Sequence, residues 1–236
     1  MTADPRTPVG LRTVPDGSFD LETFLAMPRL VNLHLSPDGS RLALTVQTVS
    51  DDGRRFAGSI WEVRTDGQSP PRRLTRSARG ETARGFLPDG SLLFTSSRSD
   101  GVPQDDSRPD IDVLYVLPTE GGEPRRMLAP AAGVGAVLSS RDSPTVVVTA
   151  ALHPGAATFE EDEARQQARE DAGVSARLVE HYPDRWWDHD VGPRRPHIFA
   201  LELAGGDAEI SAVRDLTPDP PWPGWIEGDA LAIALS

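Results

Sequence analysis

The feature of the sequence that most constrains the fold is an internal repeat with a period of about 51 residues. The segment Leu33–Thr45 returns as Gly85–Thr95, and both copies contain Pro-Asp-Gly. A third, degraded copy spans Gly135–Thr149 and keeps the register after a further 53 residues, although its proline and glycine have drifted. Each copy is an apolar segment, a turn and a second apolar segment. Because proline presets φ at the second turn position and glycine takes a position where a side chain would clash, we expect β-hairpins with positive φ at Gly39 and Gly90.

The second half of each unit repeats as well. Ile60–Val63, Val113–Leu117 and His197–Leu203 are apolar segments, and each precedes a turn that contains glycine and a further short strand. Four short strands per unit at this period are typical of β-propeller blades. We therefore expect an all-β fold, a partial β-propeller of about three four-stranded blades plus the start of a fourth. A complete small β-sandwich is excluded, because the repeat is periodic and stops within a unit.

The repeat also predicts how the chain is divided. A flexible N-terminal arm is expected at 1–19, followed by the N-terminal part of a propeller at 20–236, in which Asp20–Met27 forms one or two helical turns stopped by Pro28. The blades are expected at 30–78, 79–130 and 131–218, with an incomplete blade at 219–236. Because closed propellers need at least four blades, we expect a truncated product in which the open edges and the unpaired last strand lower stability.

The third unit is about 30 residues longer than the second, which predicts an insertion at 155–195. Thr158 and Glu161 have the spacing of a capping box, and the charged segment that follows predicts a short, exposed helix ending at Gly173. Further on, Arg185–Asp190 contains two tryptophans. We expect Arg185 to pair with Asp188, so that this segment seats the insertion on the blade.

Composition excludes several kinds of chemistry. The chain has no cysteine, and all 24 of its basic residues are arginine. Disulfides, thiolate nucleophiles, zinc–sulfur sites, Walker-type phosphate loops and Schiff-base chemistry are therefore excluded. The net charge of -12 makes the surface repel phosphate, so we expect no nucleic-acid partner. The absence of a signal-peptide core or of a long apolar stretch predicts a cytoplasmic protein with no membrane partner.

Two patterns resemble the prolyl oligopeptidase family of serine peptidases, in its acylaminoacyl-peptidase-like and dipeptidyl-aminopeptidase-like branch. The first is the Ser-Pro-Asp-Gly turn at 36–39, which many non-enzymatic propellers share. The second is Arg185–Asp190 followed by His197-Ile-Phe199, which is similar to the Arg-x-Trp-Asp and His-Leu-Phe stretch of that branch. Ile198 replaces the usual leucine, and Asp190 stands where an aromatic residue is common. The resemblance covers residues from about 20 to 236.

The resemblance implies a propeller that restricts substrate access to a C-terminal α/β-hydrolase domain, and short peptides or acyl-amino acids as substrates. That domain, absent here, would be the partner of these blades in the same polypeptide. The sequence contains no Gly-x-Ser-x-Gly nucleophile elbow, so no catalytic residue is transferred and the chain alone is expected to be non-catalytic. The alternative is a non-catalytic TolB-like propeller that binds proteins. The insertion together with its Arg-Trp-Trp-Asp segment favours the peptidase branch.

Several polar or aromatic clusters have structural interpretations that outweigh functional ones. A metal site is conceivable among five residues within 17 positions, but their spacing is irregular: His181, Asp188, His189, Asp190 and His197. The aspartates at 105–112 lack the glycine and glutamate of a calcium loop, and Trp222–Trp225 is expected to pack between blades. The sequence therefore predicts no catalytic, cofactor-binding or metal-binding residue.

Overall fold

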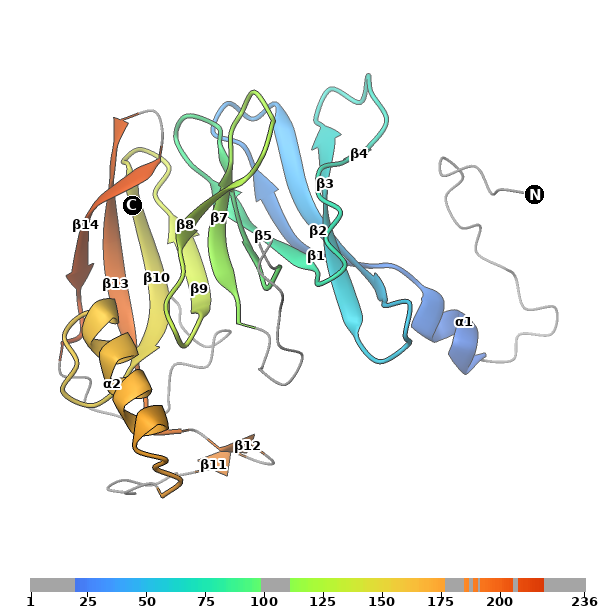
Figure 1. Ribbon diagram of the computed structural model, residues 1–236. Coiled ribbons are helices and arrows are strands. Elements are labelled where there is room, and N and C mark those ends of the chain that lie inside the picture. The colour runs from blue at the N-terminus through green and yellow to red at the C-terminus, as the bar shows by residue number, and fades with distance from the viewer. Residues whose placement is uncertain are drawn as a thin grey trace.

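The computed structural model describes residues 20–98, 111–176, 192–205 and 208–218, together with the backbone of 185–186 and 189–190. These residues form three four-stranded antiparallel sheets that stand side by side (Figure 1). The expected all-β, partial propeller with a short helical insertion in its third blade is confirmed. The arm at 1–19, the aspartates at 105, 106 and 110, and the segment 219–236 lie outside the described residues.

Each sheet follows the chain as a simple meander. The first sheet contains β1 (Arg29–Leu35), β2 (Arg41–Val49), β3 (Phe56–Arg64) and β4 (Arg72–Arg73). The second contains β5 (Glu81–Phe86), β6 (Leu92–Ser96), β7 (Val113–Leu117) and β8 (Arg125–Leu128). The third contains β9 (Val134–Ser139), β10 (Thr145–Leu152), β13 (Arg195–Ala204) and β14 (Glu209–Asp215). The expected four-strand unit is therefore present three times.

Two helices and a small ribbon lie outside the sheets. The helix α1 (Leu21–Ala26) begins at its N-cap Asp20, whose carboxylate accepts from the N–H of Thr23, and it ends before Pro28 as expected. The helix α2 (Phe159–Asp171) and the ribbon of β11 (Arg185–Trp186) and β12 (His189–Asp190) connect β10 to β13. In Figure 1, α2 lies below the third sheet, at the opposite end of the molecule from α1.

The Pro-Asp-Gly turns have the expected backbone geometry. Gly39 N–H donates to the Ser36 carbonyl over 2.9 Å, Gly90 N–H donates to the Leu87 carbonyl over 2.9 Å, and the two glycines have φ of 73° and 82°. A Cβ added to Gly39 meets nothing within 4 Å beyond its chain neighbours, so the clash that disfavours a side chain there is the local one with the adjacent backbone. The positive φ alone favours glycine at this position.

A Leu-Thr pair directly follows the last strand of the first and third sheets. Leu74 N–H donates to the Ile60 carbonyl over 2.8 Å, and Thr75 Oγ1 accepts from Ile60 N–H over 3.0 Å. In the third sheet, Leu216 and Thr217 make the same two bonds to Ile198, over 2.8 and 2.9 Å. The repeated Leu-Thr of the sequence therefore closes the outer edge of each of these two sheets onto its third strand.

The hydrophobic core lies between the sheets. Seven buried residues fill the space between the first and second sheets: Ala43, Ile60, Ala83, Phe86, Leu92, Phe94 and Tyr115. A larger, mostly aliphatic cluster joins the second sheet, through residues such as Leu93 and Leu114, to the third, through residues such as Val148 and Leu201. Face-to-face packing of neighbouring sheets is what a propeller requires, because each blade buries its apolar faces only against its neighbours.

Candidate functional site

The first strands of the three sheets lie next to one another and surround a pocket of about 390 Å³. Residues from β1, β5 and β9 and from the turns that follow line it: Leu33, His34, Leu35, Ser36, Pro37, Arg84, Gly85, Phe86, Val137, Leu138, Ser139 and Arg141. We take this pocket as the candidate site, because all three repeat units contribute equivalent positions to it.

The backbone hydrogen bonds that close the three hairpins establish which positions are equivalent. Ser36 donates to the Arg41 carbonyl, Leu87 to the Ser91 carbonyl and Ser140 to the Thr145 carbonyl, over 2.8, 2.8 and 3.0 Å. Counting back from these residues, the positions that correspond to one another are Leu33, Arg84 and Val137, and then His34, Gly85 and Leu138. The repeats therefore present different side chains at the same places, so the pocket is chemically asymmetric.

Gly85 allows the first strands of the second and third sheets to approach closely. Its φ is 142°, and a Cβ added to it would lie 2.8 Å from Ser139 Oγ. A larger residue would require at least the Ser139 hydroxyl to move, because real Cβ atoms do not approach an oxygen this closely. The sequence shows only an unremarkable glycine at this position, before the Leu-Pro-Asp-Gly turn.

His34 is half-buried and bonded to the neighbouring sheet. Its Nε2 lies 3.2 Å from the carbonyl oxygen of Ala83. Since a carbonyl only accepts, Nε2 carries the proton and donates. Burial lowers the pKa of His34, the bond to the Ala83 carbonyl raises it by less, and the positive charge of Arg84 lowers it further. The ring is therefore neutral near pH 7, with Nδ1 as an acceptor.

Two arginines bring positive charge to the pocket, and hydrogen bonds hold both. Arg84 Nε donates to Thr95 Oγ1 over 3.0 Å, and its Nη2 lies 3.9 Å from the Asp112 carboxylate, beyond hydrogen-bond distance. Arg141 Nη2 donates to the Pro37 carbonyl over 3.4 Å, so it reaches from the third sheet to the first. Guanidinium groups held in this way are suited to carboxylate ligands.

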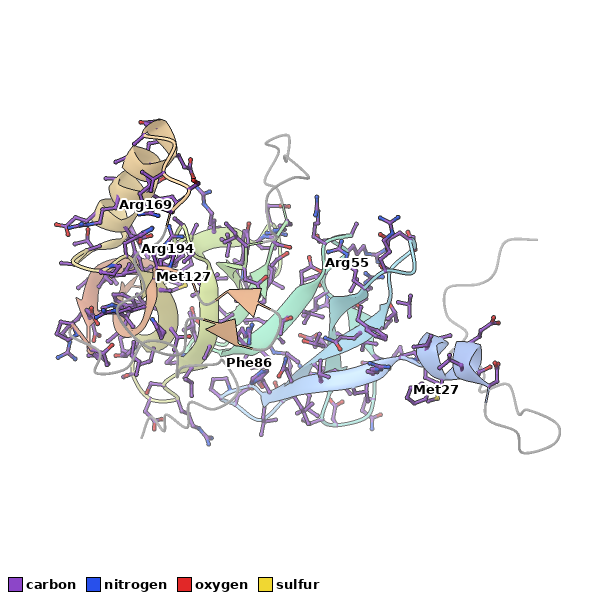
Figure 2. All side chains as sticks on the ribbon, turned by 90° about the horizontal axis from the view of Figure 1, so that it is seen from below. Met27, Arg55, Phe86, Met127, Arg169 and Arg194 are labelled. Carbon is purple, nitrogen blue, oxygen red and sulfur yellow. The ribbon has the colours of Figure 1, made fainter. Side chains whose placement is uncertain are left out.

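A second polar cluster lies at the root of the insertion. The Asp162 carboxylate on α2 accepts from both the backbone N–H and the Nδ1 of His153, over 2.7 and 2.6 Å. It also accepts from Arg194 Nε over 3.1 Å at each of its two oxygens. His153 and Arg194 lie at the two ends of the insertion, so a single carboxylate joins both ends to the helix. Figure 2 shows Arg194 beside α2, far from Met27 next to α1.

The root of the insertion is buried. The helix is exposed over most of its length, as expected, but Asp162 is only 1% exposed. Burial tends to raise the pKa of Asp162, but the bonds from Arg194 and His153 outweigh burial and hold the pKa below its usual value. Phe159 of α2 packs against Phe199 of β13, with ring centroids 4.6 Å apart. The helix is therefore attached by one charged cluster and one aromatic contact.

The cap of α2 is close to the expected one. Thr158 Oγ1 accepts from Glu161 N–H over 3.2 Å, and Gly173 ends the helix with a φ of 60°. The Glu161 carboxylate accepts from the N–H of Ala157 instead of from that of Thr158, which a reciprocal capping box would require. The predicted capping box therefore contains the hydrogen bond to Thr158 Oγ1, while the Glu161 carboxylate caps the preceding residue, Ala157.

The expected anchor at Arg185–Asp190 is not described at side-chain level, so the pairing of Arg185 with Asp188 remains a prediction. Of the five residues considered for a metal site, only His197 has a described side chain. Its Nδ1 lies 2.7 Å from Asp215 Oδ2, so Asp215 is its partner. Within the described part of the chain, no group of three or more potential metal ligands occurs.

The sequence alone did not single out the residues that form these two clusters. Arg84 and Arg141 belong to different repeats, and only the packing of β5 beside β9 brings them to one pocket. His153 and Arg194 could have been suspected from their positions at the ends of the insertion.

Among the described residues, no helix is long and apolar enough to cross a membrane.

Comparisons with known proteins place this geometry among related folds. No protein-family profile matches the chain. A curated relative from Bacillus subtilis, the uncharacterized peptidase YuxL, is 30% identical over 142 residues, which are 59% of this chain and 20% of the relative. The chain therefore spans about a fifth of the length of that relative.

Solved structures give a similar result. Acylaminoacyl peptidase from Pyrococcus horikoshii matches with a TM-score of 0.54 at 10% identity, over 84% of this chain and 26% of the peptidase. A putative TolB from Agrobacterium tumefaciens matches with a TM-score of 0.44 at 16% identity, over 80% of this chain and 48% of that protein. The peptidase match shows that the fold is the propeller fold.

Proposed function

We propose that this chain, which is similar to the propeller portion of prolyl oligopeptidase family peptidases, is the substrate-access part of a serine peptidase. The observation that carries the proposal is the 30% identity to a bacterial peptidase over 142 residues. The match to the propeller fold of an acylaminoacyl peptidase supports it. In this proposal, short peptides or acyl-amino acids are the substrates of the full-length enzyme.

The chain by itself is proposed to be non-catalytic. Acyl transfer by a serine needs an activated nucleophile and an oxyanion hole, and the strand-to-helix nucleophile elbow that supplies both does not occur in this sequence. His153 and Asp162 form a His–carboxylate pair, but the imidazole is 4% exposed, so a substrate cannot approach it. We place the catalytic triad in an α/β-hydrolase domain within the part of the full-length protein that this chain does not cover.

The proposed role of the blades is to limit entry to that domain. A channel surrounded by the first strands of the blades admits an extended peptide and excludes a folded protein. The pocket between β1, β5 and β9 lies on this surface. The blade boundaries 30–78, 79–130 and 131–218, and a cytoplasmic location, belong to the same proposal.

A serine-reactive fluorophosphonate probe tests the proposal. The 236-residue chain and the full-length protein are each treated with the probe, and labelled residues are identified by peptide mapping. We expect no labelling of the chain and labelling of the full-length protein at one serine in a Gly-x-Ser-x-Gly segment. Labelling of the chain at a single serine would contradict its non-catalytic role. A full-length protein that has no reactive serine would favour the TolB-like, protein-binding alternative.

A further inference from the structure

We infer that the pocket between β1, β5 and β9 binds the carboxylate of a short peptide, with Arg84 and Arg141 as its donors and His34 as an acceptor for a neighbouring N–H. The inference rests on the proposed function, because it names the part of a peptide that the access surface would recognise. The recognised group is either the C-terminal carboxylate or an acidic side chain.

The charge of the pocket is opposite to the charge of the protein. The chain carries 36 acidic residues and a net charge of -12. Yet none of the twelve residues that line the pocket is acidic, and two of them are arginines. The Asp112 carboxylate, 3.9 Å from Arg84 Nη2, offsets part of this positive charge. The two arginines still make the pocket more favourable to anions than the rest of an acidic surface.

The two arginines are held in place before any ligand arrives. Thr95 Oγ1 holds Arg84 through Nε, and the Pro37 carbonyl holds Arg141 through Nη2. A guanidinium has five N–H donors, and the hydrogen bonds to Thr95 and to the Pro37 carbonyl each use one of them. Anchoring also reduces the conformational entropy that binding would otherwise cost.

The remaining walls suit a peptide residue better than a small inorganic anion. Leu33, Phe86 and Val137 supply apolar surface, and the volume of about 390 Å³ lies within the range of sites for small organic ligands. His34 donates through Nε2 to Ala83, which leaves Nδ1 as the acceptor on a neutral ring. An acceptor near two cationic donors matches a carboxylate with an amide N–H beside it, as at the end of a peptide.

Binding of three acetylated tripeptides to the 236-residue chain, measured by isothermal titration calorimetry, tests the inference. The first is acetyl-Ala-Ala-Ala with a free carboxylate, the second is its C-terminal amide, and the third is acetyl-Ala-Ala-Asp amide. We expect the free acid to bind about 10- to 100-fold more tightly than the alanine amide, which is the usual worth of a charge-assisted hydrogen bond. The third peptide shows whether a side-chain carboxylate substitutes for the terminal one.

Charge-removing variants locate the site. Arg141→Gln changes an exposed turn residue and should retain the fold, while Arg84→Gln removes the second donor. Each should weaken binding of the free acid by about 10-fold or more and leave the amide unchanged. The matched control is Arg126→Gln, which removes the same charge from an exposed position on β8 and should leave the binding of both peptides unchanged.

Two results would overturn the inference: equal binding of acid and amide, or wild-type binding of the acid by Arg141→Gln and Arg84→Gln. Its failure is distinguishable from failure of the proposed function. If the full-length protein has no reactive serine but the chain still prefers the acid, carboxylate binding by the pocket is supported and the proposed peptidase function is wrong. If the serine is labelled but the chain has no preference, the peptidase stands and the pocket assignment is wrong.

Discussion

The two interfaces between neighbouring sheets are built differently. Between the first and second sheets, seven buried residues pack together, and side chains cross the interface to bind backbone groups. Thr45 Oγ1 accepts from Ala83 N–H over 2.9 Å, and Arg41 Nη2 donates to the Gly90 carbonyl over 2.8 Å. Between the second and third sheets, fifteen buried residues form one cluster in which Phe199 is the only aromatic.

The difference shows that neighbouring copies of the same repeat can pack against each other in two ways. Directional hydrogen bonds fix the register of the first interface, since each requires a particular donor and acceptor to face each other. The second interface gains its stability from apolar area, which is roughly proportional to the surface removed from water and has no preferred direction. We therefore expect substitutions to cost most at the second interface and to depend most on chemical detail at the first.

The largest effect is expected from truncation in the aliphatic cluster. Leu114 is 0% exposed, so Leu114→Ala should lower the free energy of unfolding by about 2–5 kcal/mol, measured by urea denaturation. Leu30 on β1 is 72% exposed, and Leu30→Ala is the matched control with an expected change within about 0.5 kcal/mol. Equal effects of the two substitutions would mean that the second interface is not the main source of stability.

Substitution of Asp162 tests whether the polar cluster at the root of the insertion contributes as much to stability as apolar packing does. Asp162→Asn removes the charge that holds Arg194 and His153, and should cost about 2–3 kcal/mol. The effect should be local, seen by hydrogen exchange as faster exchange in α2 while β10 and β13 stay protected. Glu163→Gln, one position along the same helix at an exposed site, is the control and should change neither readout. Unchanged exchange in α2 would show that Phe159 alone secures the helix.

A smaller loss is expected at the first interface. Thr45→Val keeps the volume of the side chain but removes the acceptor for Ala83 N–H, which should cost about 1–2 kcal/mol. Thr119→Val is a suitable control, because its hydroxyl donates to the Asp89 carbonyl at an exposed site. If both substitutions lower the free energy of unfolding by the same amount, the hydrogen bond between the two sheets contributes no more than an exposed one.

Two glycine substitutions separate backbone strain from crowding, one in a turn and one on β3 where the first sheet meets the second. Gly39→Val forces a branched residue to a φ of 73° and should cost about 1–2 kcal/mol, although nothing crowds the added side chain. Gly58 has ordinary φ, but its Cβ would lie 2.4 Å from the Glu81 carbonyl oxygen, so Gly58→Ala reports on crowding alone. A change near zero for Gly39→Val would mean that the turn is misassigned.

The smallest effect is expected from pH, and it should separate the two interfaces. The pKa of His34 is lowered by folding, so its contribution to stability is complete above its unfolded value of 6.5 and is lost as pH falls below it. The pKa of Asp162 is also lowered, so its contribution is complete above 3.8 and is lost as pH falls through the folded value. The aliphatic cluster has no titratable member.

Urea denaturation at pH 7 and pH 5 of the wild type and of His34→Gln measures the first of these contributions. The wild type should lose stability between these values, and the variant should lose less. Leu114→Ala should keep the pH dependence of the wild type, because it changes only apolar packing. If His34→Gln keeps the full pH dependence of the wild type, His34 does not contribute to that dependence.

Local chemistry made much of the fold predictable from the sequence. The cap at Thr158 and the Pro-Asp-Gly turns each depend on residues within a few positions of one another. Their repetition at a fixed period then predicted three four-stranded sheets. At Gly39 the sequence predicted both the turn and the positive φ, because the clash that disfavours a side chain there is local to the backbone.

Only the tertiary structure decided where the polar groups meet. Arg84 and Arg141 come from neighbouring repeats and reach one pocket because β5 and β9 lie side by side, where Gly85 faces the Ser139 hydroxyl. His153 and Arg194 meet at Asp162 because the insertion leaves and re-enters the third sheet on the adjacent strands β10 and β13. A turn is specified by the residues that form it, whereas a contact between distant segments is specified by the packing of whole sheets, to which every buried residue contributes.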